Sequence, residues 1–218
     1  MPKATYKTET RARLISSAER LFAERGIDGV SLREINVRSG ARDVYALQYH
    51  FKDRSGLLQA VVDKHLIGIE EVRNRMLDEY EANDTPNIRL LGLALVQPLA
   101  AKLSDPNSGR DFLIIYADLL NRRRPHIGVG VIEDEHNSLY RWSNMLTPLL
   151  PHESVRYQRR FKAVLMTAIE LSRRARDAER SDDSVFISDL VDTVCAILEV
   201  ESSEETLRLA AARRRTRD

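Results

Sequence analysis

Few side chains in this 218-residue sequence have the types and spacing that catalysis requires. Glu133 and His136 form a Glu-x-x-His motif, the spacing found in di-iron carboxylate bundles, but such bundles need a second copy that the sequence lacks. Cys195 is the only cysteine, which excludes an intrachain disulfide and a zinc site built on thiolates. There is also no Gly-rich phosphate loop and no G-x-S-x-G motif. We therefore expect no enzyme, no metal and no cofactor, and keep a metal-dependent helical enzyme as an alternative.

The charged side chains are distributed unevenly along the chain. The formal net charge is only +1, which by itself argues against a nucleic-acid partner. Residues 1–60, however, hold 11 Lys and Arg against 7 Asp and Glu, a net charge of +4, and residues 61–218 carry a net charge of −3. The last eleven residues contain five arginines and one aspartate. A basic start on an acidic body is a pattern that indicates contact with a polyanion at one end.

The elements that would present this charge are helices. Apolar residues over 9–25 recur at the spacing of an amphipathic helix, and Gly26 suits the left-handed residue that closes it. Ser31 and Glu34 form an S-x-x-E capping box that starts a second, short helix. Gly40 ends that helix, and Asp43 can cap a third one. Two short helices joined by a tight turn predict a helix-turn-helix, whose second helix is the right size for a DNA major groove.

The remaining sequence also predicts helices and no strand. Asp53 can cap a long helix, and breaks at Pro86, residues 104–109, Pro125 and residues 148–151 separate the helices that follow. The expected fold is all-α with nine helices. We expect three segments: a helix-turn-helix domain with a basic arm at 1–53, a helical ligand-binding and dimerisation domain at 54–203, and an Arg-rich tail at 204–218 that is frayed.

Residues 10–66 resemble the N-terminal domain of TetR-family transcriptional regulators. The resemblance rests on A-x-x-L-F-A-E-R-G at 18–26, S-L-R-E-I at 31–35, L-Q-Y-H-F at 47–51 and D-R-x-x-L-L at 53–58, in that order and at that spacing. It implies a cytoplasmic DNA-binding protein, most often a repressor, that dimerises through its last two long helices. The helix count and chain length are similar to those of this family.

The DNA contacts that we predict follow from this arrangement. Arg33 matches the family position best suited to a bidentate contact with guanine, and Gln48 can pair with adenine. The base-reading residues are expected to be Arg33, Val44, Tyr45, Ala46 and Gln48. The residues expected to hold phosphates are Ser31, Arg42, Tyr49, His50 and Arg54, the last at the N-terminus of a helix.

The acidic body is expected to bind a small molecule. A pocket needs mostly apolar walls with a few polar groups. The predicted lining consists of Phe112, Tyr116, Leu120, His136, Tyr140, Met166 and Glu170. An apolar or amphipathic effector would fit it, and would release the DNA by favouring a different spacing of two DNA-binding heads.

A wide apolar stripe on the last two long helices predicts a homodimer with a four-helix interface. Its expected members are Val164, Leu165, Ala168, Leu171, Phe186, Ile187, Leu190, Val191, Val194 and Leu198. Burial of the same stripe inside one chain is the competing interpretation, and a helical adaptor that binds another protein is a further alternative. No apolar run is long enough for a membrane span and the N-terminus lacks the apolar region of a signal peptide, so we expect a cytoplasmic protein without a membrane partner.

Overall fold

The computed structural model describes residues 3–41, 45–83, 86–122, 137–177 and 182–215, and within these ranges it is entirely helical and loop. The first helices are α1 (Lys3–Arg25), α2 (Leu32–Arg38), α3 (Ala46–Phe51) and α4 (Arg54–Glu81). Then follow α5 (Ile88–Ala100), α6 (Gly109–Leu120), α7 (Ser138–Leu146) and α8 (His152–Arg156). The last helices are α9 (Arg159–Arg176), α10 (Ser184–Glu199) and α11 (Glu204–Arg215), and two short 3₁₀ helices cover Ala101–Ser104 and Thr147–Leu149.

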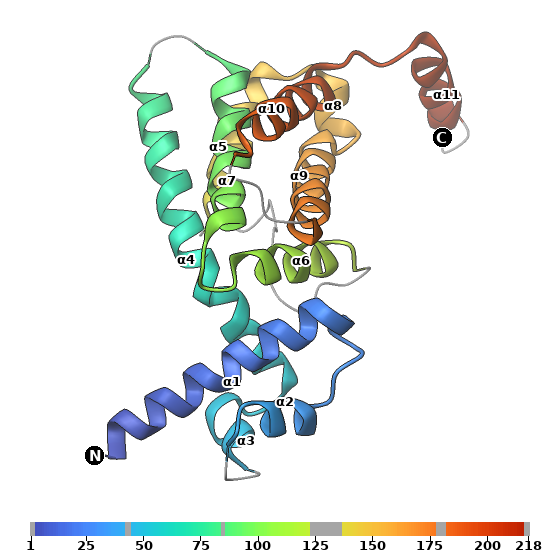
Figure 1. Ribbon diagram of the computed structural model, residues 1–218. Coiled ribbons are helices and arrows are strands. Elements are labelled where there is room, and N and C mark those ends of the chain that lie inside the picture. Colours follow the sequence, from blue (N-terminus) through green and yellow to red (C-terminus); the bar gives the residue numbers. More distant parts are fainter. Residues whose placement is uncertain (1–2, 42–44, 84–85, 123–136, 178–181, 216–218) are drawn as a thin grey trace.

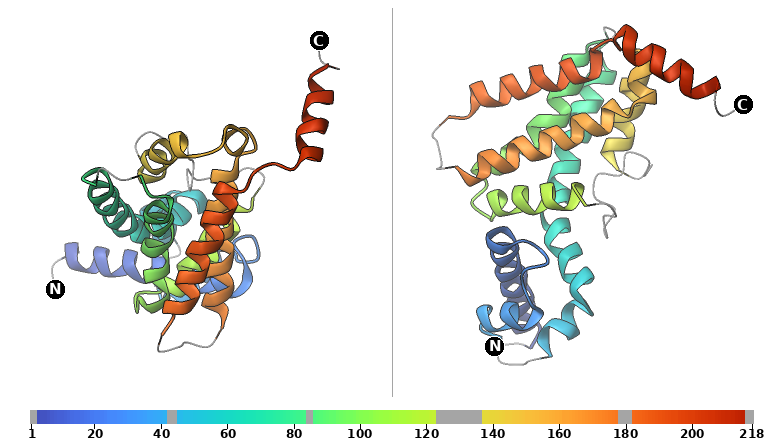
Figure 2. Two further views of the ribbon diagram at one scale, coloured as in Figure 1. Left: turned by 90° about the horizontal axis from the view of Figure 1, so that it is seen from above. Right: turned by 90° about the vertical axis from the view of Figure 1, so that its right-hand side faces the viewer.

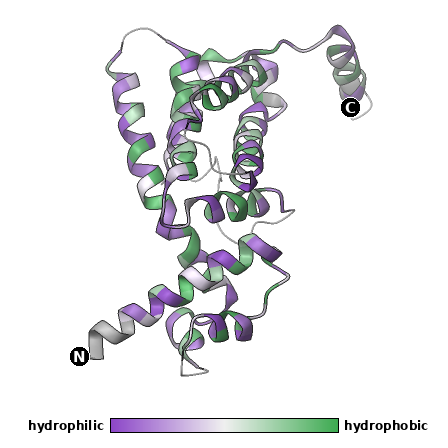
Figure 3. Ribbon diagram, viewed as in Figure 1, coloured by the Kyte–Doolittle hydropathy of each residue, from purple (hydrophilic) through white to green (hydrophobic). Residues whose placement is uncertain are grey.

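The molecule has a small head and a larger body (Figure 1). The head consists of α1, α2 and α3, and α4 runs from the head into the body, where it packs against α5. In the body α6 packs on α9, and α10 packs on both α5 and α9, while α1 of the head lies against α6. Helix α11 projects away from the body in all three views (Figures 1 and 2). A single cluster of buried apolar side chains extends from α1 to α10, and apolar residues are especially dense on α5 and α10 (Figure 3).

The all-α prediction is confirmed for the described residues, but the expected nine helices are too few, because the structure has eleven α-helices there. One long helix was expected over 153–178. It is interrupted at Gln158, whose backbone is left-handed with φ of 53°, and so becomes α8 and α9. The tail expected to be frayed contains α11. A helix was expected from residue 131. In the described ranges α7 begins at Ser138, and residues 131–136 lie outside those ranges.

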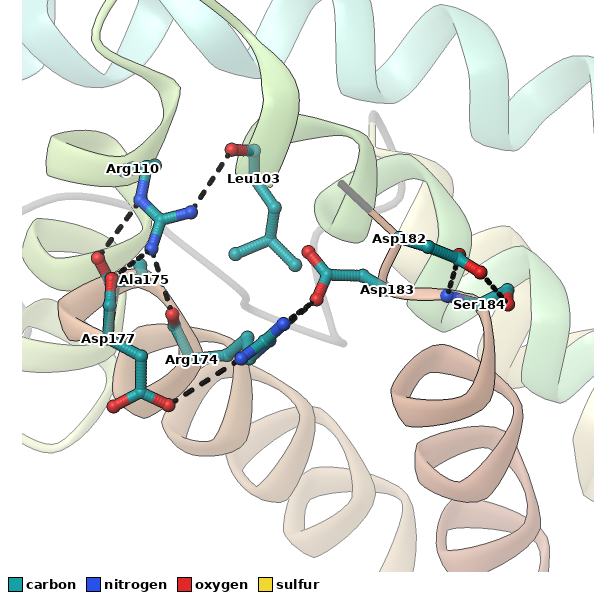
Figure 4. Close-up of polar contacts among 8 residues, drawn as sticks. All are labelled: Leu103, Arg110, Arg174, Ala175, Asp177, Asp182, Asp183 and Ser184. Atoms are coloured by element: carbon teal, nitrogen blue, oxygen red, sulfur yellow. Dashed lines mark hydrogen bonds and ion pairs between the residues drawn. The ribbon is translucent and has the colours of Figure 1, made fainter. Parts of the chain in front are cut away.

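Arginine side chains join the end of α9 to α6 and to the start of α10 (Figure 4). The Arg110 guanidinium on α6 donates to the carbonyl oxygens of Arg174 (3.0 Å), Ala175 (3.1 Å) and Asp177 (2.6 Å), which are groups that the end of α9 leaves unpaired. Arg174 in turn donates from Nε to the Asp183 carboxylate at 2.6 Å, at the start of α10. These contacts hold α6, α9 and α10 together as one unit.

The predicted left-handed glycine after the first helix is confirmed, since Gly26 has φ of 79° and donates its N–H to the Phe22 carbonyl at 2.9 Å. We expect Gly26→Ala to lower the free energy of unfolding by about 1–2 kcal/mol, because an L side chain strains this conformation. Urea denaturation measures the effect. Gly68→Ala in α4 is the control, because its Cβ would meet nothing within 4 Å and its φ is not positive. An equal loss in both variants would contradict the prediction.

Candidate nucleic-acid interface

The first helix of the helix-turn-helix starts where the sequence predicts. Ser31 is the N-cap of α2, and its Oγ accepts a hydrogen bond from the Glu34 backbone N–H at 3.2 Å. The Glu34 carboxylate accepts from the Ser31 N–H at 2.7 Å, which completes the capping box. The Ser31 hydroxyl also donates to Glu34 at 2.8 Å. The side chain of Ser31 is therefore engaged in the cap, so any phosphate contact there would have to compete with the cap.

The cap gives Glu34 an unusual acidity. The hydrogen bond from the Ser31 backbone, followed by that from Arg25 at 2.7 Å, lowers the pKa of Glu34 from 4.5 to about 2. Because the folded pKa is depressed, the stabilisation is complete above the unfolded value near 4.5 and is lost as the pH falls toward 2.

We expect a carbon-detected NMR titration of the full chain to place the Glu34 midpoint near 2. In Arg25→Gln the midpoint should rise toward the ordinary value, because one of the two main causes is removed. A midpoint near 4.5 in the unaltered protein would show that the capping box does not persist in solution.

Arg33 lies in the first turn of α2 and is exposed to solvent. The simplest structural role for it would be an ion pair with the neighbouring Glu34, but that carboxylate is engaged by Arg25 and Ser31. Among the described residues Arg33 has no ion pair. Its guanidinium is thus available to a ligand, as the predicted contact with guanine requires.

In and just before α3, the predicted DNA contacts divide into exposed and buried side chains. Tyr45 and Tyr49 are 71% and 68% exposed, Gln48 is exposed, and His50 is half-buried with its ring edge-on to Tyr49 at 5.1 Å. Ala46, by contrast, is only 7% exposed. Its methyl group belongs to the core of the head, and base reading by Ala46 stays a prediction. Arg42 and Val44 lie outside the described residues, as does the predicted cap Asp43.

Arg54 was expected to bind a phosphate and instead stabilises the head. Its guanidinium donates to the Ile27 carbonyl at 2.9 Å and to the Val30 carbonyl, and it lies 5.8 Å from the centre of the Phe22 ring. The side chain thus ties α4 to the loop between α1 and α2. Only the position of Arg54 at a helix N-terminus was visible in the sequence, whereas its partners are 24 and 27 residues away. The cap predicted at Asp53 is confirmed by its hydrogen bond from the Gly56 N–H at 2.8 Å.

A groove beside this face combines predicted contacts with residues that were not predicted, such as Lys52 and Gln59. This groove of about 560 Å³ runs between α1, α3 and α4 and is lined by Arg11, Gln48, Tyr49, Lys52 and Gln59, among others. Arg11 lies over the Phe51 ring at 5.3 Å. Val37 on α2 is 73% exposed. The sequence contained a signal that could have indicated Val37 as a contact residue. It is an apolar residue on the polar side of α2, where it does not contribute to the core.

Two polar contacts join the head to the body. Glu19 of α1 is fully buried, and its carboxylate accepts from Lys64 Nζ and is 2.7 Å from His65 Nε2, both on α4. The His65 ring stacks on Phe112 of α6 at 4.5 Å. Separately, Arg122 bridges Asp28 in the loop between α1 and α2 (2.9 Å) and Asp118 of α6 (3.1 Å). Specific side-chain contacts therefore link the head to α6 of the body.

The residues predicted to line a ligand pocket are only partly brought together. Phe112 and Tyr116 lie side by side on α6 with ring centroids 5.5 Å apart, and both are buried, as is Leu120. Tyr140 and Met166 are half-buried, Glu170 pairs with Arg173 at 3.1 Å, and His136 lies outside the described ranges. A groove of about 350 Å³ between α1, α6 and α9 is lined by Phe22, Ile114, Asp118, Ile169 and Arg176, among others, and by none of the predicted residues.

The predicted dimer stripe is largely buried within one chain. Val164, Ala168, Leu171, Leu190, Val191, Val194 and Leu198 are each at most 3% exposed. The reason is that this face of α9 packs on α6, and that of α10 packs on α5 and α9. At Gly92 of α5 the helices are so close that a Cβ would lie 3.0 Å from Cys195 Sγ. These seven residues are therefore core residues of the single chain, and their part in a dimer interface stays a prediction. Leu165, Phe186 and Ile187 remain half-buried.

In the described ranges, no group of three or more His, Cys, Asp or Glu side chains is arranged to hold a metal ion. Glu133 and His136 lie outside those ranges. No helix of the described chain combines the length and the apolar character needed to cross a bilayer.

A short capped helix with an exposed arginine, followed by a second short helix, is typical of helix-turn-helix DNA-binding domains. Residues 14–61 match the family model described as bacterial regulatory proteins, tetR family. The resemblance to TetR-family transcriptional regulators is thus confirmed over the N-terminal domain, and it indicates DNA-binding transcription regulation. A comparison with curated proteins gives no match.

Solved structures that match this chain include a TetR-family transcriptional regulator from Rhodococcus sp., at 18% sequence identity and a TM-score of 0.44, covering 88% of this chain and all of that one. Another is RolR in complex with its ligand resorcinol, at 20% identity and a TM-score of 0.45, covering 93% of this chain and 99% of that one.

Proposed function

We propose that this protein is a transcriptional repressor that binds a palindromic DNA operator and is released from it by a small apolar or amphipathic molecule. The observation that carries the DNA-binding part is the exposed Arg33 without an ion pair among the described residues, on a helix-turn-helix that lies within the family match. In this proposal residues 1–53 bind DNA, 54–203 bind the effector and form the dimer, and 204–218 form a basic tail. Its place of action is the cytoplasm.

The exposed side chains of the head divide between base and phosphate contacts. Arg33 donates to guanine O6 and N7, and Gln48 pairs with adenine, while Tyr45 reaches the adjacent base edges. Tyr49 and His50 donate to phosphate oxygens, which fixes the register on the duplex. The two residues Arg42 and Val44 complete these sets as proposals from the sequence alone.

Release follows from the head–body contacts. An effector that stabilises a body conformation in which α6 shifts would move α1 through the Glu19–His65–Phe112 contacts and the Arg122 bridge. The effector lowers operator affinity only if it binds that conformation more tightly than the DNA-bound one. The direct packing of α1 on α6 makes the head sensitive to such a shift.

A palindromic operator requires two heads about 34–36 Å apart, one for each successive major groove. We propose a homodimer formed by the outer faces of α9 and α10, where Leu165, Phe186 and Ile187 remain partly accessible. Light scattering at micromolar concentration tests this: a mass of about 50 kDa, twice the 24.9 kDa chain, is expected, and a monomer would contradict it.

The experiment for the proposed function is selection of bound fragments from the source genome by the purified protein, followed by sequencing. We expect enrichment of a few sites that share an inverted repeat. Uniform recovery of fragments would contradict the proposal. The genes beside the selected sites then indicate the chemistry of the effector.

A further inference from the structure

The buried face of α4 includes an arginine. Residues 65, 69, 73 and 77 follow one another at intervals of four, so they lie on one face of the helix, and all four are buried. The third of them is Arg73, which is 1% exposed. A buried charge is expensive unless each of its donors is paired, so the partners of this guanidinium decide its role.

Arg73 is only partly paired. Nε donates to the Ala94 carbonyl on α5 at 3.1 Å, and Nη1 donates to Ser138 Oγ on α7 at 2.8 Å. Nη1 also lies 3.3 Å from the Glu70 carboxylate, whose oxygens already accept from the Ser138 N–H at 2.6 Å and the Ser138 hydroxyl at 2.9 Å. Nη2 is buried and has no hydrogen-bond partner in the described chain.

A second interior side chain that carries a donor, Tyr116 of α6, lies near Arg73. This tyrosine is 2% exposed. Burial raises its pKa to about 12, and the nearby charge of Arg73 acts in the opposite direction. The hydroxyl is therefore protonated at neutral pH and able to donate. The neighbouring Phe112 ring, in turn stacked on His65, gives this interior an aromatic wall.

We propose that Arg73 Nη2 and the Tyr116 hydroxyl form an anion-binding site inside the body for the carboxylate of a small organic acid with an apolar remainder. A carboxylate satisfies both donors at once, and charge-assisted hydrogen bonds to a guanidinium are the strong ones. Glu70 does not take this place, because its oxygens are held by Ser138. The inference rests on the proposed function in one respect, because it identifies the chemical class of the effector.

The test uses the full-length protein and isothermal titration with two acids, benzoate and hexanoate, each compared with its own amide. The expected result is that at least one acid binds about tenfold or more tightly than its amide, the effect of a hydrogen bond to a charged group. Arg73→Met should abolish this preference. Tyr116→Phe, which removes only a hydroxyl and is less disruptive to folding, should weaken binding of that acid by about three- to tenfold.

The matched control is Arg141→Gln on α7, whose guanidinium pairs with Asp78 and Glu81 near the surface and should not affect acid binding. Equal binding of acid and amide, or no binding of either acid, overturns the proposal. Acid binding that persists in both Arg73→Met and Tyr116→Phe places the site elsewhere and also overturns it. Selection of genomic DNA with the same preparation separates the two proposals. DNA binding without acid binding contradicts only the carboxylate site. Acid binding without DNA binding contradicts only the proposed function.

Discussion

Replacing Arg33 with alanine is expected to lower operator affinity by about 5- to 150-fold, which corresponds to about 1–3 kcal/mol for the loss of a bidentate contact with guanine. The expectation depends on two features of α2. The guanidinium is exposed, and the acidic neighbour that could have neutralised it is held by Arg25 and Ser31. Fluorescence anisotropy with the selected operator and with a scrambled duplex measures the change.

Arg173→Ala is the matched control, because this exposed arginine is in the body on α9 and pairs only with Glu170 at 3.1 Å among the described residues. Its operator affinity should equal that of the unaltered protein. If Arg33→Ala weakens binding to the operator and to the scrambled duplex by the same factor, Arg33 contacts phosphate and not a base. An unchanged operator affinity would remove it from the interface.

Glu19→Ala is expected to lower the free energy of unfolding by about 3 kcal/mol or more. The carboxylate is fully buried between head and body, and its loss leaves Lys64 and His65 without the acceptor that both contact at 2.7 Å. Breaking a buried pair costs about 3–5 kcal/mol, and the lower end applies because Lys64 is 32% exposed. Chemical denaturation followed by circular dichroism gives the value.

Glu24→Ala on the same helix provides the comparison. Glu24 pairs with Arg20 at 3.0 Å and Arg38 at 3.6 Å, but all three side chains are at least 41% exposed. Exposed ion pairs contribute about 0–1 kcal/mol, so this variant should remain close to the unaltered protein. A similar loss in both variants would show that Glu19 stabilises α1 in general and not the junction with α4.

The parts of the head that the sequence predicted correctly depend on local contacts. The capping box joins residues three apart, as does the Asp53 cap, and the left-handed backbone of Gly26 follows from its lack of a Cβ. The contacts of Arg54 within the head were not visible in the sequence because its carbonyl partners precede it by more than 20 residues. The burial of Ala46 was not visible because a six-residue helix has too few residues to show which face is buried.

The body was harder to predict because apolar periodicity does not tell one buried surface from another. The stripe on α9 and α10 could cover a partner chain or α5 and α6, and the structure shows the second case for residues such as Val194 and Leu171. Arg73 gave a usable signal that was missed. It is a charged residue at an apolar position of α4, and such a residue needs partners that only the fold can supply.

The proposed repressor function depends on sequence-specific DNA binding by the head. The most direct measurement is the affinity of the purified protein for the selected operator and for a scrambled duplex of the same length, at several salt concentrations. We expect the operator to be preferred by about 10³-fold or more, with both affinities falling as salt rises because phosphate contacts release counterions. Equal affinities for the two duplexes would contradict the account.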